Sequence, residues 1–278
     1  MYGEEMLTRV GNNLGLMKEG APPESAQIER EGYALLRSVF DADEVAELID
    51  DVERVYASTS PDERLRDRSE FRYEMYNRSA VVQRAIGHRR ILDVIEPLLG
   101  EDCHVIANTC WWNPADHEGG PWHCDAGPHV PRPEGVDWDD RIPYPIFVIG
   151  AHLWLWDVTA ADGPTAVIPG SHRSGRLAPR DRVSDPDLVH DGEAAIAPEA
   201  NAGDVLLFSS DIWHRGTAAA DGGKGRLFIQ CHYGRRDIAQ RVLTTAAVNH
   251  VSAEAIDRIA SERERQLLGL HAPFFYDG

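Results

Sequence analysis

The spacing of apolar residues changes near residue 103 of this 278-residue chain. Before that point apolar side chains recur every three or four positions, which is typical of amphipathic helices. Asp41 and Glu44 have the spacing of a capping box, in which each side chain binds a free N–H group at a helix start. The pattern predicts helices that begin after Asp41, after Ser79 and near His88, and a short strand over 33–36.

After residue 103 the chain consists of short apolar or alternating runs, separated by segments rich in Gly, Pro, Asp and Asn. Short strands divided by turn-forming residues are typical of an antiparallel sandwich or barrel rather than of alternating strands and helices. Helical spacing returns near 256–267, where we expect a last helix. The predicted strands cover 103–112, 121–125, 146–158, 165–168, 204–210 and 226–233.

No repeat, low-complexity tract or linker divides the sequence, so we expect one mainly β domain with flanking helices. The predicted parts of this domain are an N-terminal arm (1–27), a helical flank (28–102), a β core (103–235) and a C-terminal helical segment (236–278).

Composition limits the possible partners. A formal net charge of -18 repels nucleic acid and anionic lipid, so neither is expected as a partner. The sequence has no apolar run of membrane-spanning length, and its N-terminus lacks the features of a signal peptide. Four cysteines without C-x-x-C spacing indicate reduced thiols. We expect a cytoplasmic protein, either a monomer or a homodimer.

Three residues of the β region have the chemistry of metal ligands. His123 and Asp125 are two positions apart, and on a strand such residues point to the same face, roughly 6–7 Å apart. His214 comes later, at the far end of the strand that we predict to begin after the Gly-Asp turn at 203–204. Two histidines and one carboxylate leave metal positions open for a co-substrate and O2, as in non-haem iron(II) oxygenases. The alternatives are a polar turn around His123 and a capped strand end at His214.

Arg226 indicates which co-substrate would bind at the open metal positions. It follows His214 by twelve residues, across a predicted turn over 221–225, and shares a strand face with Phe228 and Gln230. A guanidinium that points into a barrel requires an anion, because an unpaired buried charge is costly. A carboxylate bound through two hydrogen bonds would supply it, and 2-oxoglutarate carries such a group. A surface ion pair is the alternative.

Together these elements resemble the pattern of the phytanoyl-CoA dioxygenase family. That pattern is H-x-D, then N-G-x-x-x-x-x-P-G-S-H, then G-D-x-x-x-F-x-x-x-x-x-H, and an Arg about a dozen residues later. The matching segments are His123-x-Asp125, 162–172, 203–214 and Arg226. The segment 32–37 and the helix after it are also similar to the start of the family, so the resemblance covers roughly residues 28 to 270.

The resemblance implies a double-stranded β-helix, the cupin-like jelly roll, as the core between flanking helices. It also implies a catalytic iron(II) bound by His123, Asp125 and His214, with O2 as a substrate and ascorbate as a stimulant. Arg226 would bind 2-oxoglutarate, and Thr165 stands where several fungal members provide a further contact. Those members have Gln at the position of Gly120, which leaves the remaining 2-oxoglutarate contacts open.

Two other positions bear on the resemblance. Asp162 replaces the usual Asn of a turn, which is a mild change. Asp125 excludes halogenation, because related halogenases have Ala or Gly there so that chloride can bind the iron. The alternative for Thr165 is that it is an ordinary strand residue without a role in binding.

The expected activity is hydroxylation of an unactivated C–H group in a small molecule, with release of succinate and CO2. A secondary metabolite, an amino acid or a lipid-type molecule would fit, and desaturation, epoxidation and cyclisation use the same ligands. A non-catalytic jelly roll that binds a metal or ligand is the alternative from another class. A hydrolytic zinc enzyme is disfavoured because no general base is evident beside the three ligands.

Substrate contacts are expected in two segments near the predicted metal site. The loop 127–145 contains Trp138 and Arg141, and the segment 172–182 contains Arg173. Long loops beside a site are often lids, although a solvated loop is the alternative. Among the other histidines, His172 is expected to stabilise its own turn, and the sequence indicates no partner for His117, His152 or His232.

Overall fold

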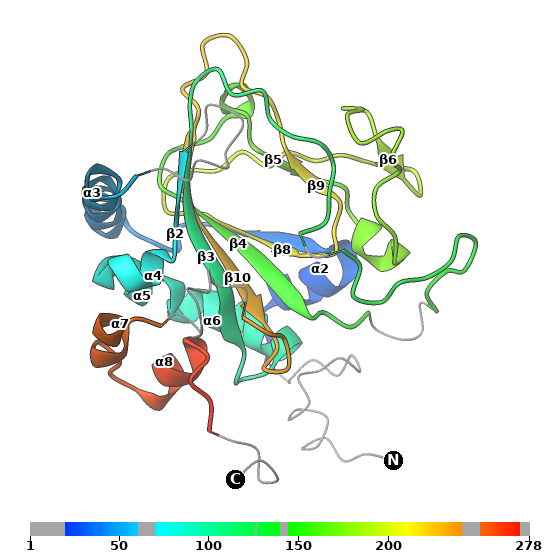
Figure 1. Cartoon of the computed structure of the whole chain (residues 1–278). Coiled ribbons are helices and arrows are strands. Elements are labelled where there is room, and N and C mark those ends of the chain that lie inside the picture. Colours follow the sequence, from blue (N-terminus) through cyan, green and yellow to red (C-terminus); the bar gives the residue numbers. More distant parts are fainter. Residues whose placement is uncertain (1–19, 61–69, 126, 140–143, 241–250, 273–278) are drawn as a thin grey trace.

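The computed structural model describes residues 20–60, 70–125, 127–139, 144–240 and 251–272. Its largest feature is a six-stranded antiparallel sheet with the strand order β1-β8-β4-β10-β3-β2 (Figure 1). The strands of this sheet are β1 (Tyr33–Leu36), β2 (Glu70–Tyr73), β3 (His104–Asn113), β4 (Val148–Trp154), β8 (Val205–Ser209) and β10 (Arg226–Gly234).

A second, smaller sheet faces the large one (Figure 1). It pairs β5 (Thr165–Val167) with β9 (His214–Gly216), and isolated bridges extend it on both sides, from His214 to His123 and from Val167 to Ile196. A separate hairpin joins β6 (Val189–His190) to β7 (Glu193–Ala194). The two facing sheets form a double-stranded β-helix, which confirms the predicted fold class.

Helices cover the outer face of the large sheet (Figure 1). The helices before β3 and after β10 in the described part of the chain are α2 (Pro23–Glu31), α3 (Ala42–Ser58), α4 (Met75–Arg78), α5 (Ala80–Ile86), α6 (Arg89–Leu99), α7 (Ala253–Asp257) and α8 (Glu262–Leu267). Two short 3-10 turns, η1 (Ala160–Asp162) and η2 (Ser171–Ser174), lie before and after β5.

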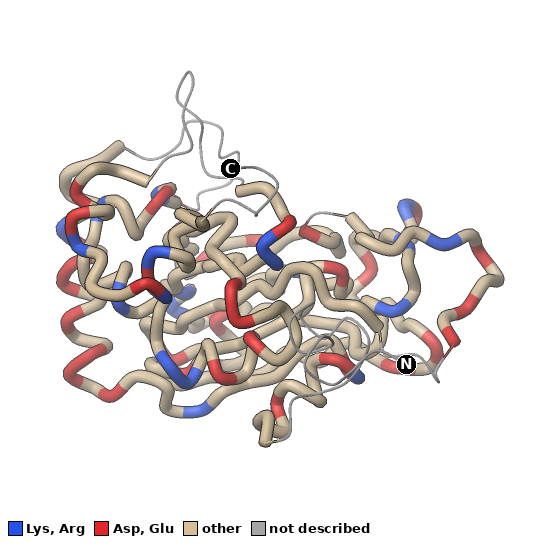
Figure 2. Tube along the Cα trace, turned by 90° about the horizontal axis from the view of Figure 1, so that it is seen from below, with Lys and Arg blue, Asp and Glu red and all other residues tan. Residues whose placement is uncertain are grey.

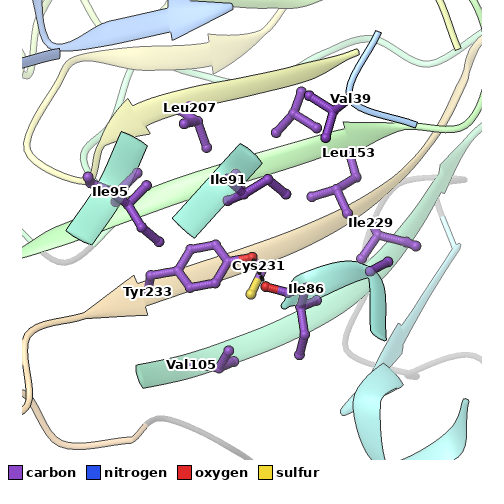
Figure 3. Close-up of a cluster of buried hydrophobic side chains, with 14 of the residues drawn as sticks. Val39, Ile86, Ile91, Ile95, Val105, Leu153, Leu207, Ile229, Cys231 and Tyr233 are labelled. Atoms are coloured by element: carbon purple, nitrogen blue, oxygen red, sulfur yellow. Dashed lines mark hydrogen bonds between the residues drawn. The ribbon is translucent and has the colours of Figure 1, made fainter. Parts of the chain in front are cut away.

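Alternation along β10 separates the core from the inner space of the jelly roll. Ile229, Cys231 and Tyr233 point outward and pack against Ile86 and Ile91 of the helices (Figure 3). Burying each large apolar side chain stabilises the fold by roughly 1.5–3 kcal/mol relative to exposure. The intervening residues Arg226, Phe228, Gln230 and His232 point the other way, into the cavity between the sheets.

The local helix signals are confirmed. Asp41 caps α3, its side chain accepts the Glu44 N–H at 2.9 Å, and the Glu44 carboxylate accepts the Asp41 N–H. Ser79 caps α5 in the same way through Val82, and α6 ends before Gly100, whose φ of 105° suits glycine. These signals act within one helical turn, so sequence alone identifies them.

Two predicted strands differ from the structure in the region that carries the candidate ligands. Segment 121–125 forms only the single bridge at His123, and Asp125 N–H donates instead to the Ser210 carbonyl at 3.1 Å. The predicted strand from 204 to His214 is divided, because β8 ends at Ser209 and a turn closed by Ile212 N–H follows. His214 therefore begins β9 in the opposite sheet, and this position brings it beside His123.

The predicted last helix is also divided. Apolar spacing predicted one helix over 256–267, but Ser252 and Ser261 each cap a short helix of their own, α7 and α8. The Arg258 side chain at the end of α7 binds the Tyr76 carbonyl, so the break packs on α4. The large sheet also includes β1 and β2, which lie outside the predicted core range of 103–235.

Negative charge is concentrated along α3. Asp and Glu residues lie along α3, at the left of Figure 2, and few basic residues accompany them. All four cysteines are free thiols. No helix in the described part of the chain has the length and apolar character needed to cross a bilayer.

Candidate active site

The three candidate ligands, which are separated in sequence, lie together between the two sheets. His123, Asp125 and His214 place their donor atoms within 4.8 Å of one another. His123 Nε2 is 3.8 Å and His214 Nε2 is 3.4 Å from the same carboxylate oxygen, Asp125 Oδ1. The side chains of Asp125 and His214 are largely buried, whereas that of His123 is half exposed toward the opening.

Main-chain carbonyls orient both imidazoles. His123 Nδ1 donates to the Pro121 carbonyl at 2.9 Å, and His214 Nδ1 donates to the Ile212 carbonyl at 3.0 Å. A carbonyl only accepts, so Nδ1 carries the proton in each ring and Nε2 has a free lone pair. Both lone pairs are therefore available on the side of the ring that faces Asp125, as metal coordination requires.

Electrostatics keep the Asp125 carboxyl ionised. Burial by itself would raise the pKa of Asp125, but the imidazoles of His214 and His232 hold that pKa well below its usual range. Burial would lower the pKa of His214, and the Asp125 carboxylate raises it above its ordinary value instead. Burial, followed by repulsion from His214, lowers the pKa of His123. The cluster thus holds one anion beside two imidazoles, and a metal ion would replace the proton that Asp125 favours on His214 Nε2.

This donor set fits a divalent transition metal. Bonds of about 2.1 Å at right angles would place neighbouring donors about 3 Å apart, close to the separations in this cluster. Nitrogen and oxygen donors on one side of a metal are the set that non-haem iron(II) enzymes use.

Arg226 lies deeper in the same cavity with a buried positive charge. The residue is 6 % exposed, its Nε donates to Asn113 Oδ1 at 2.9 Å, and the guanidinium lies 5.4 Å from the centre of the Phe228 ring. Burial lowers the pKa of Arg226 to about 10, so the group stays protonated at neutral pH. Within the described residues no carboxylate forms an ion pair with it. A buried cation of this kind favours an anionic ligand.

Thr165 lies beside this guanidinium. Its hydroxyl accepts from Arg226 Nη1 at 3.4 Å and is 3.1 Å from His152 Nδ1. Burial and the nearby Arg226 hold the pKa of His152 well below its usual range, so this imidazole is neutral. The hydroxyl can therefore donate to His152 while it accepts from Arg226. Its place matches the contact with 2-oxoglutarate that the resemblance implied, which stays a prediction.

Gly216 provides the room for the guanidinium. A Cβ atom at this position would collide with Arg226 Nη2, so a larger residue would displace the arginine. Gly216 belongs to β9, two residues after His214, and therefore connects the metal ligand to the anion site. Gly120 also lines the cavity, and a side chain there would meet no heavy atom within 4 Å.

A cavity of about 370 Å³ connects the candidate metal ligands to Arg226. Trp111 and Gln230 line a wall of it, and Trp111 Nε1 donates to Gln230 Oε1 at 2.7 Å. The indole N–H only donates, so the atom that it contacts must be the amide oxygen, and the amide nitrogen of Gln230 has the other orientation. The cavity thus combines an anion site, an aromatic surface and amide donors.

The predicted substrate residues lie elsewhere. Trp138 and Arg173 line a second cavity of about 350 Å³, with Arg132 and His190 and without the metal-ligand cluster. Arg141 lies outside the described residues. A role in substrate binding stays a prediction for all three.

Sequence reasoning missed Asn113, His152 and His232 of the metal-site cavity, whereas His117, which also lines it, was expected either to touch substrate or to lie in a surface loop. His232 Nε2 is 2.8 Å from Asp125 Oδ2, and His117 Nε2 is 3.1 Å from the Asp162 carbonyl. The available signal was strand alternation, since His232 continues the face of Arg226, Phe228 and Gln230. His172, by contrast, binds the Glu29 carbonyl at 3.0 Å, in agreement with the structural role expected for it.

Comparison with known proteins identifies related sequences and folds. The model of the family described as phytanoyl-CoA dioxygenase (PhyH) matches residues 28–224. An ectoine dioxygenase of Sphingopyxis alaskensis is 26% identical over 219 residues, which cover 69% of this chain and 68% of the relative.

Two solved structures share the fold. EctD from S. alaskensis with 2-oxoglutarate and 5-hydroxyectoine superposes with a TM-score of 0.65 at 23% identity, covering 85% of this chain and 84% of the other. The epimerase SnoN in complex with Fe3+, alpha ketoglutarate and nogalamycin RO has a TM-score of 0.63 at 20% identity, covering 83% and 92%. At these identities the likeness concerns the fold.

Proposed function

The chain belongs to the phytanoyl-CoA dioxygenase family, and on this premise we propose that it hydroxylates an unactivated C–H group of a small molecule. The enzyme is a dioxygenase that uses iron(II), O2 and 2-oxoglutarate. In the proposed reaction one oxygen atom of O2 enters the substrate as hydroxyl and the other enters succinate, while 2-oxoglutarate loses CO2. The observation that supports this most is the joint placement of His123, Asp125 and His214 in one cavity with the buried cation of Arg226.

We assign iron(II) to His123, Asp125 and His214. An iron ion bound there would supply O2 activation coupled to decarboxylation of 2-oxoglutarate. The chain itself contributes two oriented lone pairs and one carboxylate oxygen, and these leave further metal positions free. Halogenation is not proposed, because the Asp125 carboxylate occupies the position where a halide would bind.

We assign the distal carboxylate of 2-oxoglutarate to Arg226. The guanidinium offers a planar set of N–H donors that suits a carboxylate, and burial strengthens such a contact by excluding water. The Thr165 hydroxyl, which accepts from Arg226, would donate to this carboxylate in place of His152. Both residues therefore orient the co-substrate, and neither transfers a proton in the reaction.

The substrate would bind against Trp111 and Gln230, on the cavity wall beside the metal ligands. An aromatic surface favours an apolar or flat group, and the Gln230 amide nitrogen favours an acceptor oxygen. Since the S. alaskensis relative is named an ectoine dioxygenase, ectoine is a sensible first compound to test. Desaturation, epoxidation or cyclisation at the same site would be distinguished by product analysis.

Turnover of 2-oxoglutarate without substrate tests the proposed activity. The wild-type protein with iron(II), ascorbate and O2 should release succinate slowly, and Asp125→Ala and His214→Ala should lose this release. Asp50→Ala, at an exposed position of α3 that does not line the cavity, is a suitable control that should keep the wild-type rate. Unchanged rates in both ligand variants would show that the metal assignment is wrong. No succinate from the wild type under any substrate would favour a non-catalytic binding protein.

A further inference from the structure

His232 contacts the one anionic member of the metal-ligand cluster. Its Nε2 atom is 2.8 Å from Asp125 Oδ2, whereas the two candidate ligand histidines lie nearest to the other oxygen, Oδ1. An ionised carboxylate only accepts hydrogen bonds, so His232 Nε2 must donate. The two carboxylate oxygens therefore have different partners, Oδ1 on the side of His123 and His214 and Oδ2 on the side of His232.

The main chain at His232 is held by regular strand pairing, whereas the main chain at Asp125 is not. His232 lies in β10, which is paired on one side with Gly150 of β4 and on the other with Ala107 of β3. Its side chain is 10 % exposed. Asp125 lies in a segment with a single bridge to the small sheet, so fewer main-chain bonds determine its position.

An irregularity in β3 lies directly beyond the pair of His232 with Ala107. The register with β10 shifts between His232 and Tyr233, so Ile106 has no partner in the ladder. A bulge of this kind reverses which face the following side chains occupy. Val105 thus joins the core under the helices, while Ala107 lines the cavity beside His232. Such bulges are frequent next to active sites, where they redirect side chains.

We infer that His232 is a positioning residue that presents Asp125 to the metal through a single oxygen. This inference rests on the proposed iron site and adds a residue to it. A carboxylate that turned to bind with both oxygens would occupy one more metal position, and those positions are needed for 2-oxoglutarate and O2. The hydrogen bond of His232 holds Oδ2 toward β10, so the carboxylate presents Oδ1 to the ion. Hydrogen bonds to ligating groups typically raise metal affinity about 10–100-fold.

Two amide substitutions separate the hydrogen bond from the bulk of the ring. In His232→Gln the amide nitrogen reaches approximately the position of the imidazole Nε2 and can still donate to Asp125. In His232→Asn the amide lies one carbon nearer to the main chain and cannot reach. His232→Phe keeps a ring of similar size without any donor. His104, which is buried in β3 away from the cavity, provides the control His104→Gln for loss of a buried imidazole.

Anaerobic titration with Co(II) alone, followed by its visible absorption, tests the inference without any turnover. We expect His232→Asn and His232→Phe to bind Co(II) about 10–100-fold more weakly than the wild type. His232→Gln should recover most of the affinity, and His104→Gln should match the wild type. Wild-type affinity in His232→Asn, or a loss in His232→Gln as large as that in His232→Phe, would overturn the inference. If His232→Phe fails to fold, the Co(II) affinities of His232→Asn and His232→Gln still test the inference.

The same measurements distinguish an error in the proposed function from an error in the role of His232. If the wild type itself bound no Co(II) and released no succinate, the iron site would be wrong. If the wild type bound Co(II) and released succinate while His232→Asn did the same, only the role of His232 would be wrong. Once a substrate is known, a second measurement is the ratio of 2-oxoglutarate consumed to hydroxylated product formed. This ratio should be higher in His232→Asn than in the wild type.

Discussion

A single buried charge explains much of the chemistry of this cavity. Arg226 makes hydrogen bonds to Asn113 and Thr165 but has no carboxylate partner among the described residues. The folded protein bears the cost of desolvating this cation before any ligand arrives, and an incoming carboxylate recovers part of it. The residue thus contributes to co-substrate affinity at the expense of stability.

Arg226→Met should separate these two effects. We expect the dissociation constant for 2-oxoglutarate to rise roughly 10–100-fold, because a charge-assisted hydrogen bond contributes about 1.5–3 kcal/mol. The ligand-free variant should melt at or above the wild-type temperature, since an unpaired buried charge is removed. Calorimetric titration and thermal melting measure the two quantities. Wild-type affinity for 2-oxoglutarate would exclude Arg226 as the anchor.

At the scale of elements, the turn between β8 and β9 connects the metal ligands to the loop that follows Asp125. Asp211 in this turn is 3 % exposed and accepts the His129 N–H at 2.8 Å through Oδ2. Its other oxygen is 2.5 Å from His129 Nδ1. The same side chain therefore holds the start of the 127–139 loop against the strand that begins with His214.

Asp211→Asn should loosen this loop. The amide can replace only one of the two contacts with His129 and carries no charge. We therefore expect a glutamate-specific protease to cleave after the exposed Glu134 several-fold faster. Metal affinity should change little, because Asp211 is not a ligand. Asp185→Asn, which removes an exposed pairing with Arg182, is the matched control. Equal cleavage rates in the wild type and Asp211→Asn would argue against an anchoring role.

The turn after β5 is joined to α2 through His172. Its Nε2 binds the Glu29 carbonyl, and its Nδ1 is buried without a hydrogen-bond partner. Burial lowers the pKa of His172 from 6.5 to about 4. As the pH falls below 6.5 the unfolded chain takes up a proton that the folded protein excludes until about pH 4. The free energy of unfolding should therefore decrease across this range.

His172→Gln keeps a donor for Glu29 and removes the titration. Its free energy of unfolding should decrease less than that of the wild type between pH 6.5 and 4, where the His172 contribution is up to about 1.4 kcal/mol per pH unit. Denaturant unfolding at a series of pH values measures the difference. Parallel pH profiles for the two proteins would contradict the burial of a neutral imidazole at this position.

Features that depend on neighbouring residues could be predicted from the sequence. The capping box of Asp41 and Glu44 acts within one turn, and the motifs at His123 and His214 have characteristic spacing. The division of strand 204–214 could not be predicted. The turn after Ser209 depends on the pairing of β9 with β5 in the other sheet, and these strands are far apart in sequence. His232 was missed for a similar reason, since 107 residues separate it from Asp125.

At the scale of the whole molecule, the jelly roll brings together ligands from separate parts of the chain. The small sheet provides His214 and its bridge to His123, while the large sheet provides Arg226 and His232. The helices on the outer face bury the other side of β10 and fix the strand that carries both of these cavity residues. The facing arrangement itself was predicted through the family resemblance, because the hydrophobic pattern indicated only a sandwich or barrel.

Anaerobic titration of the iron(II)-loaded protein with 2-oxoglutarate tests the central claim most directly, because the chelate absorbs visible light by metal-to-ligand charge transfer. The account predicts a band that saturates at about one 2-oxoglutarate per chain. The band should be absent in His214→Ala and should require roughly 10–100-fold more 2-oxoglutarate in Arg226→Met. A wild-type protein that shows no band at saturating iron(II) and 2-oxoglutarate would contradict the proposed site.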